Sequence, residues 1–165
     1  MNLRKFEGPR TKPRRGDIFD VQIGDFRVPG RVVSTSMVVT GIPDCIVVYL
    51  FNPVSAEWAP DDRTPLQVSN LMLSPQIVER YAWSERYFRT IERSEFGPGE
   101  LLERNRFRIP PGLPGMARYE GKYFDENGNE SDPAEFFGRY ASGSHGTVNI
   151  ALSKALGLEY KISDS

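Results

Sequence analysis

The chain has a single cysteine, Cys45, and a single histidine, His145, among its 165 residues. One cysteine cannot close an internal disulfide, and this pair cannot supply the four ligands of a structural zinc site. Cys45 lies in an apolar run, where a core position is expected, because a reactive thiol needs an exposed, electropositive setting. We therefore expect a protein of a reducing compartment, without a metal or another cofactor.

Excess charge and long apolar runs are also missing. The 21 Lys and Arg residues nearly balance the 22 Asp and Glu residues, which gives a net charge of −1. A general nucleic-acid binder needs a basic excess to neutralise phosphates, and a membrane span needs about 18 consecutive apolar residues. The N-terminus lacks the apolar segment of a signal peptide. The sequence predicts a soluble, cytoplasmic protein that binds neither nucleic acid nor membrane.

Catalytic motifs are absent as well. The chain contains neither a glycine-and-lysine phosphate loop nor a dinucleotide fingerprint. Residues 125–132 carry oxygen-bearing side chains as calcium loops do, but Gly128 is the fourth residue instead of the sixth, and Phe136 stands at the twelfth position instead of Glu. We interpret this segment as a polar hairpin turn, and the Gly-Ser-His-Gly run around His145 as a linker into a helix. We expect no catalytic residue and no enzyme activity.

What is present suits one domain. With 165 residues, of which 39% are hydrophobic, the chain can bury a core of its own. Residues 1–15 hold six Lys or Arg against one Glu, and residues 119–165 hold four against eight acidic residues. We expect a flexible basic arm over residues 1–15 and a single domain over residues 16–165.

The N-terminal half reads as strands. Alternation over 17–23 predicts a half-buried strand, and Gly24-Asp25 predicts a turn into a return strand over 26–34. Pro29-Gly30 inside that return strand indicates an edge position or a bulge. The continuous apolar run 45–51 predicts a strand buried on both faces.

The C-terminal half is more mixed. Residues 66–73 are another strand candidate, and within 76–93 a strand over 86–91 is favoured over a helix. Residues 119–125 predict a strand leading into a hairpin at Asn127-Gly128, and 147–157 predict a helix with Thr147 as N-cap and Gly157 at its end. Together these elements predict an α+β, mainly β fold: a curled antiparallel sheet with an SH3-like barrel as its N-terminal portion and a C-terminal helix.

Two groups of side chains are candidates for binding a partner, because aromatic residues and Arg are the usual anchors of protein interfaces. One is an aromatic-acidic loop and the other an aromatic-basic cluster, and a core position remains the alternative for each tryptophan. The candidate residues are Trp58, Asp61, Asp62, Trp83, Arg86 and Arg89.

Four short motifs resemble the N-terminal half of the immunity protein 26 family of bacterial polymorphic toxin systems. They are Arg15–Phe19, Gly24-Asp25, Gly30–Val33 and Ile46–Phe51. Trp83 with Tyr87-Phe88, and the segment Tyr123–Gly128, extend the similarity. The resemblance implies a mostly β protein that binds and neutralises a toxin in the cell that makes it. The family is not defined by catalytic residues, so it implies no active site; Pro29 departs from the plain hairpin strand expected.

A rival family comes from a different functional class. The Gly16-Asp17-Ile18 opening also resembles PemK-like endoribonuclease toxins, in which Arg31 with Ser34 or Thr35 would act on RNA. The Arg-Pro pair and the Gly-x-Glu-Gln segment of those toxins are missing. A generic protein-binding β-domain is a third interpretation. We favour the immunity role, with a cognate protein toxin as partner; a basic nuclease would suit the acidic C-terminal half. A homo-oligomer is compatible with the sequence.

Overall fold

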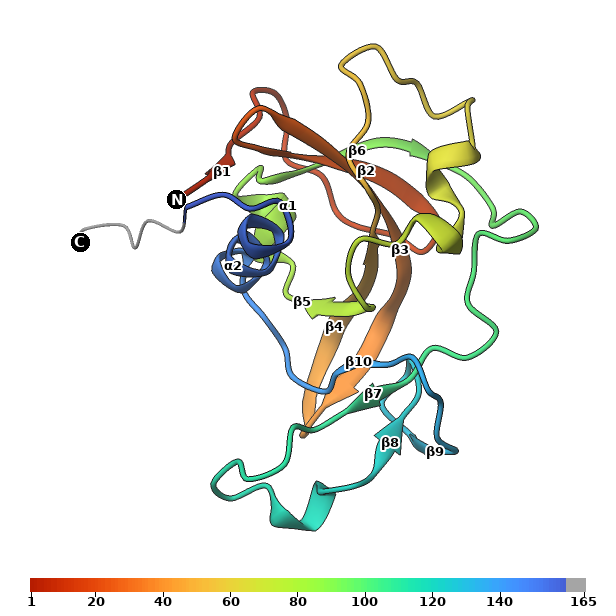
Figure 1. The fold of residues 1–165 in the computed structure, drawn as a ribbon, viewed down its shortest axis with the longest axis vertical. Coiled ribbons are helices and arrows are strands. Elements are labelled where there is room, and N and C mark those ends of the chain that lie inside the picture. Colours follow the sequence, from red (N-terminus) through yellow and green to blue (C-terminus); the bar gives the residue numbers. More distant parts are fainter. Residues whose placement is uncertain (160–165) are drawn as a thin grey trace.

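A computed structural model describes residues 1–159, and its largest element is a curled, six-stranded antiparallel sheet that forms a half-barrel (Figure 1). Neighbouring strands follow the order β1-β2-β3-β4-β5, and β6 also pairs with β2. The strands are β1 (Leu3–Arg4), β2 (Asp17–Ile23), β3 (Phe26–Val39), β4 (Ile42–Leu50), β5 (Gln76–Val78) and β6 (Phe88–Arg93). The mainly β, α+β fold expected from the sequence is confirmed.

A smaller four-stranded sheet of order β10-β7-β8-β9 lies beyond the ends of β3 and β4 (Figure 1). Its strands are β7 (Phe107–Arg108), β8 (Tyr123–Phe124), β9 (Glu130–Ser131) and β10 (Gly138–Arg139). The helices are α1 (Tyr81–Ser84), α2 (His145–Ala155) and the 3-10 turns η1 (Thr64–Leu66), η2 (Val68–Asn70) and η3 (Ala117–Tyr119). Within residues 1–159, no helix has the length and apolar character needed to cross a membrane.

The hairpin of β2 and β3 turns at Gly24-Asp25, as predicted, and pairs Ile23 with Phe26. Strand β2 is not half-buried, however. Phe19 and Val21 face one hydrophobic cluster, Ile18 faces another, and Asp20 on the supposed solvent face is fully buried. The sheet is therefore covered on both faces, and any polar side chain under that cover needs a partner.

Strand β3 runs unbroken through Pro29-Gly30 and pairs with β2 on one side and β4 on the other, so the predicted edge or bulge at this point is wrong. The Pro29 carbonyl accepts a hydrogen bond from the amide of Phe51, one residue beyond the end of β4. In an antiparallel sheet the N and O of one residue face the same neighbouring strand, so the N–H that Pro29 lacks would point toward β4. Because β4 has already ended at this position, the strand tolerates the proline.

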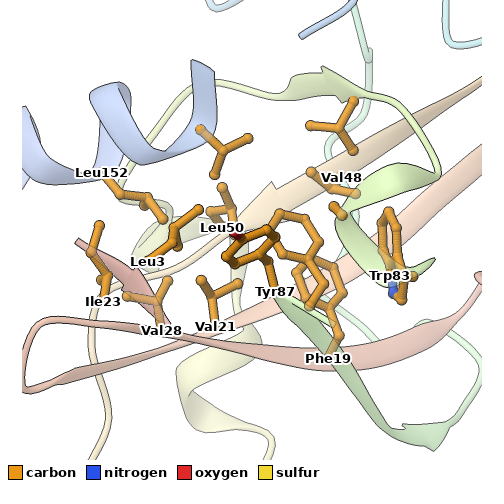
Figure 2. Close-up of a cluster of buried hydrophobic side chains, with 14 of the residues drawn as sticks. Leu3, Phe19, Val21, Ile23, Val28, Val48, Leu50, Trp83, Tyr87 and Leu152 are labelled. Carbon is orange, nitrogen blue, oxygen red and sulfur yellow. The ribbon is translucent and has the colours of Figure 1, made fainter. Parts of the chain in front are cut away.

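Two hydrophobic clusters lie on opposite faces of the sheet. Figure 2 shows the first, in which Leu152 of α2, Leu3 of β1 and Trp83 of α1 pack onto side chains of β2, β3 and β4. The second lies under the loops after β4 and β6. Strand β4 contributes to both, with Val48 in the first and Val47 in the second, so the prediction of a strand buried on both faces is confirmed.

Several boundaries differ from those expected. Residues 66–73 form no strand; η1 and η2 occupy much of this stretch, and Leu66 is buried under the second cluster. The strand favoured over 86–91 is β6. The C-terminal helix is confirmed, but it begins two residues earlier than predicted, after Ser144, and Thr147 lies inside it.

The basic segment 1–15 packs on the domain at its start. Leu3 is buried, and the side-chain oxygen of Asn149 on α2 accepts the amides of Asn2 and Leu3, both at 3.0 Å. At the other end, residues 160–165 of the expected domain and of the acidic segment lie outside the described residues.

Candidate functional site

A fully buried carboxylate, Asp20 of β2, joins two arginines from the neighbouring strands. Arg27 of β3 donates from Nε to Oδ2 at 2.8 Å. Arg89 of β6 donates from Nε to Oδ1 at 3.0 Å and from Nη2 to Oδ2 at 2.6 Å. The two-pronged contact of Arg89 fixes both its position and its plane. The strand register produces this cluster, since Asp20 lies opposite Arg89 and Gln22 lies opposite Arg27.

The cluster carries more positive than negative charge, because two guanidinium groups share one carboxylate. The hydrogen bonds from Arg89 to Asp20 raise the pKa of that guanidinium, so it stays charged. The side chain of Arg27 is 15% exposed and that of Arg89 is 49% exposed. The positive charge therefore reaches solvent mainly at Arg89.

An aromatic ring lies against each arginine. The guanidinium carbon of Arg27 is 5.2 Å from the ring centre of Trp58, and that of Arg89 is 4.2 Å from the ring centre of Phe6. Arg27 also donates from Nη1 to the carbonyls of Trp58 at 2.7 Å and Ala56 at 3.2 Å. The Trp58 indole donates to the carbonyl of Asp62 at 3.0 Å. These contacts hold the 52–63 loop beside the sheet.

The two arginines of the cluster and both rings line a cavity of 520 Å³, which we call the Arg27–Arg89 groove; Asp20 lies buried beneath it. Its lining residues are Phe6, Gln22, Asp25, Arg27, Val54, Ala56, Trp58 and Arg89.

The structure brings together two of the six predicted partner-binding residues, Trp58 and Arg89, in this groove. Asp61 and Asp62 are exposed on the same loop as Trp58. Arg86 lies in the turn before β6, where its carbonyl accepts the amide of Phe6. Trp83 is 1% exposed in the first core cluster, where its ring packs edge-on against other rings (Figure 2), so it is not accessible to a partner.

Sequence reasoning missed three residues of this site: Phe6, Asp20 and Arg27. The one signal was Asp20 itself, an acid between Phe19 and Val21 at the middle of a strand. Its place on the polar face of an alternating pattern led to a solvent-facing assignment.

Arg31, the residue on which the endoribonuclease alternative depended, is fully buried. It donates from Nη1 to Glu100 Oε1 at 2.6 Å and from Nη2 to the carbonyl of Ser94 at 2.9 Å. Ser34 is also buried. A guanidinium enclosed in this way cannot reach an RNA phosphate without rearrangement of the loop that carries Glu100.

The remaining reactive side chains have structural surroundings. His145 begins α2 and stacks on Tyr87 with ring centres 4.5 Å apart. Cys45 is buried, and burial raises the pKa of its thiol. Asp125 Oδ1 accepts the amides of Asn127 and Asn129, which makes the 125–132 segment a hairpin turn. Across residues 1–159, no three His, Cys, Asp or Glu side chains are grouped to hold a metal ion.

Comparisons with known proteins gave no match, whether against protein-family models, curated protein sequences or solved structures. We therefore infer the function from the geometry of this chain and from its sequence motifs.

Proposed function

We propose that this chain is a bacterial immunity protein that acts in the cytoplasm, where it binds and neutralises a cognate polymorphic toxin through the Arg27–Arg89 groove, without catalysis. The observation that carries the binding role is the groove itself, in which one buried carboxylate holds two arginines and an aromatic ring lies against each of them. The toxin as partner rests on the motif resemblance to immunity protein 26.

The groove suits protein recognition because its anchors are ordered before a partner arrives. Aromatic and Arg side chains dominate the binding energy of protein interfaces. Asp20 fixes Arg89, so less side-chain entropy is lost on association. Each guanidinium has five N–H donors, and the Nη1 of Arg89 makes none of the hydrogen bonds found within residues 1–159. That nitrogen can donate to a carbonyl or carboxylate of the toxin.

The rim adds charge of the opposite sign. Asp61 and Asp62 are exposed on the loop that carries Trp58. An acidic group of the toxin would pair with Arg89, and a basic surface next to that group would pair with Asp61 and Asp62. Such complementary charges favour fast association.

The test is co-expression with the toxin encoded beside this chain's gene. Cells should survive with the wild-type protein, and a complex should be recovered by pull-down. Trp58→Ala should weaken that complex by about tenfold or more, as expected for a truncated interface anchor. Arg89→Lys keeps the charge but loses the two-pronged geometry, so it should weaken binding as well. Melting temperatures of both variants check that they remain folded.

Tyr81→Ala is the matched control, because this exposed aromatic side chain lies on α1 and does not line the groove. The immunity role fails if cells die equally fast with and without the protein and no complex is recovered. A gene neighbourhood without a toxin, together with capture of another protein by the same groove, would favour the generic protein-binding domain instead.

A further inference from the structure

A second cavity, of 730 Å³, lies between the start of β2 and the end of β6. Residues 15–16 line it on one side and residues 93–96 with Leu101 line it on the other, so we call it the Arg15–Arg93 pocket. Its two sides meet at Gly16, whose carbonyl accepts the amide of Ser94 at 3.1 Å. A Cβ on Gly16 would lie 2.7 Å from the Ser94 carbonyl oxygen, so only glycine allows this close approach. The volume is that of a small-molecule site.

Two exposed arginines of this pocket make no ion pair within 4.0 Å among the described residues, although Asp17 lies opposite Arg93 in the β2–β6 pair, where burial raises the pKa of Asp17 and the charge of Arg93 acts to lower it. Neither Arg15 nor Arg93 takes part in any ion pair found within residues 1–159. Arg15 is nevertheless held in place, because its Nη1 donates to the carbonyl of Val33. One carboxylate, that of Glu95, is also part of the lining.

Further positive charge lies behind the pocket. Buried Arg31 and half-buried Arg63 both donate to Glu100 Oε1, at 2.6 Å and 3.1 Å, so two cations share one carboxylate. The Nε of Arg31 is buried with no hydrogen-bond partner. Burial lowers the pKa of Arg31, and the nearby charges of Arg63 and Arg15 lower it further, which reflects mutual repulsion among these groups.

The pocket also has an apolar wall. The Phe96 ring lies 4.2 Å from the guanidinium carbon of Arg31 and 5.1 Å from that of Arg15, and it is partly exposed. Leu101 is partly exposed beside it. A ligand that places a charged group at the arginines can therefore bury an apolar group against these two side chains.

We propose that the Arg15–Arg93 pocket binds a small phosphate monoester that carries a flat or apolar group. The phosphate lies between Arg15 and Arg93, and the organic group packs on Phe96 and Leu101. A phosphate monoester suits the pocket better than a monocarboxylate, because its near-double negative charge and three peripheral oxygens match two separate guanidinium groups. The carboxylate of Glu95 disfavours a ligand whose charge extends beyond the phosphate.

Phenyl phosphate is the probe, with inorganic phosphate and phenol as its two halves. Titration followed by NMR amide shifts should show saturable binding of phenyl phosphate with a Kd of about 1 mM or tighter, centred on residues 15–16 and 93–96. Inorganic phosphate should bind more weakly and phenol should not bind. Arg93→Gln, at a position without an ion pair to lose, should weaken binding about tenfold or more. Arg15→Gln should do the same.

Arg118→Gln is the matched control, since it removes the same charge from η3, which does not line this pocket. The proposal is overturned if phenyl phosphate causes no saturable shifts at these residues, or if Arg93→Gln and Arg118→Gln bind it equally well. It stands independently of the toxin-binding role, because Trp58→Ala should bind phenyl phosphate as the wild type does, and Arg93→Gln should still protect cells.

Discussion

The Asp20 carboxylate fixes the positions of both arginines in the Arg27–Arg89 groove. It is fully buried and receives three hydrogen bonds from charged donors. Asp20→Ala leaves Arg27 and Arg89 without their shared anion; because both guanidinium groups reach solvent in part, the free energy of unfolding should fall by about 1–3 kcal/mol, less than for a fully buried pair. Urea denaturation followed by tryptophan fluorescence measures this loss.

Asp25→Ala is the control for Asp20→Ala, because Asp25 stands in the turn of the same hairpin and is fully exposed. Within residues 1–159 its one ion pair, with Arg4 at 3.7 Å, lies at the surface, where such pairs contribute little. Equal losses in the two variants would contradict the anchoring role of Asp20.

Tyr49 makes the stability of the fold depend on pH in alkali. Its hydroxyl is buried, donates to Asn105 and accepts the amide of Leu102 at 3.1 Å. Burial raises its pKa to about 12 from an ordinary value of 10.0. Because the folded state holds the phenolic proton more tightly than the unfolded chain, this contribution is fully present below pH 10 and is lost as the pH rises towards 12.

The expected loss at Tyr49 is about 2–3 kcal/mol of unfolding free energy, from the size of the pKa shift. Denaturant unfolding in mildly and strongly alkaline buffer measures it. Tyr49→Phe should be less stable near neutrality, since it gives up both hydrogen bonds, but its stability should fall less steeply with pH. An identical pH slope in Tyr49→Phe and in the exposed-site variant Tyr81→Phe would rule out this assignment.

At the scale of elements, the contact between β2 and β3 depends on Gly30. A Cβ at this position would lie 2.3 Å from Cζ of Phe19, its partner across the strand pair. The Phe19 ring is fully buried and stacks on Phe88 with ring centres 4.8 Å apart, so it has nowhere to move. Gly30→Ala should therefore lower the unfolding free energy by about 1–3 kcal/mol, the usual effect of overpacking a core.

Two further variants separate crowding from the general effect of replacing glycine. Gly146→Ala, inside α2, should leave stability unchanged or raise it by up to about 1 kcal/mol, because alanine favours a helix. Phe19→Leu in the Gly30→Ala background should recover part of the loss by making room. If the double variant loses as much unfolding free energy as the two single variants lose together, crowding of Phe19 is not the cause.

The elements found from sequence are those whose signal is local. Strands β2, β3 and β4 and the turn at Gly24-Asp25 follow from alternation, apolar runs and turn chemistry over a few residues. Pro29 was misread because its effect depends on where β4 ends, which is a property of the neighbouring strand. The stretch 66–73 was misread because its apolar side chains pack on both clusters, with Leu66, Val68 and Leu71 at the second and Met72 and Leu73 at the first, and this packing requires no strand.

At the scale of the whole molecule, the groove could not be read from the sequence. Trp58 and Arg89 lie 31 positions apart, and they meet only because β6 returns to the edge of β2 while the loop after β4 folds beside it. The covering of both sheet faces turned Asp20 from an expected surface residue into the centre of the site. Both tryptophans belong to core clusters, but Trp58 in the second cluster keeps 9% of its surface exposed and lines the groove, whereas Trp83 in the first cluster is 1% exposed and packs against Phe19 and Phe88.

The two ends of the described chain are joined through Asn149. This buried side chain on α2 accepts the amides of Asn2 and Leu3, and β1 in turn pairs with the end of β2. Asn149→Ala leaves these two amides without their acceptor, which lowers the unfolding free energy by about 1–3 kcal/mol. It should also release β1, so that the amides of residues 2 and 3 exchange with solvent faster than those of β2.

Ile150→Ala is the control, because the next residue on the helix is 45% exposed and contributes nothing to this junction. It should leave exchange at residues 2 and 3 unchanged. Unaltered exchange there in Asn149→Ala would show that Leu3 packing, strand pairing and the hydrogen bonds of the Asn2 side chain to Ser153 and Glu159 hold β1 without Asn149. Faster exchange would show that α2 holds β1 through Asn149, while Phe6, two residues after β1, keeps its own hydrogen bond to the Arg86 carbonyl.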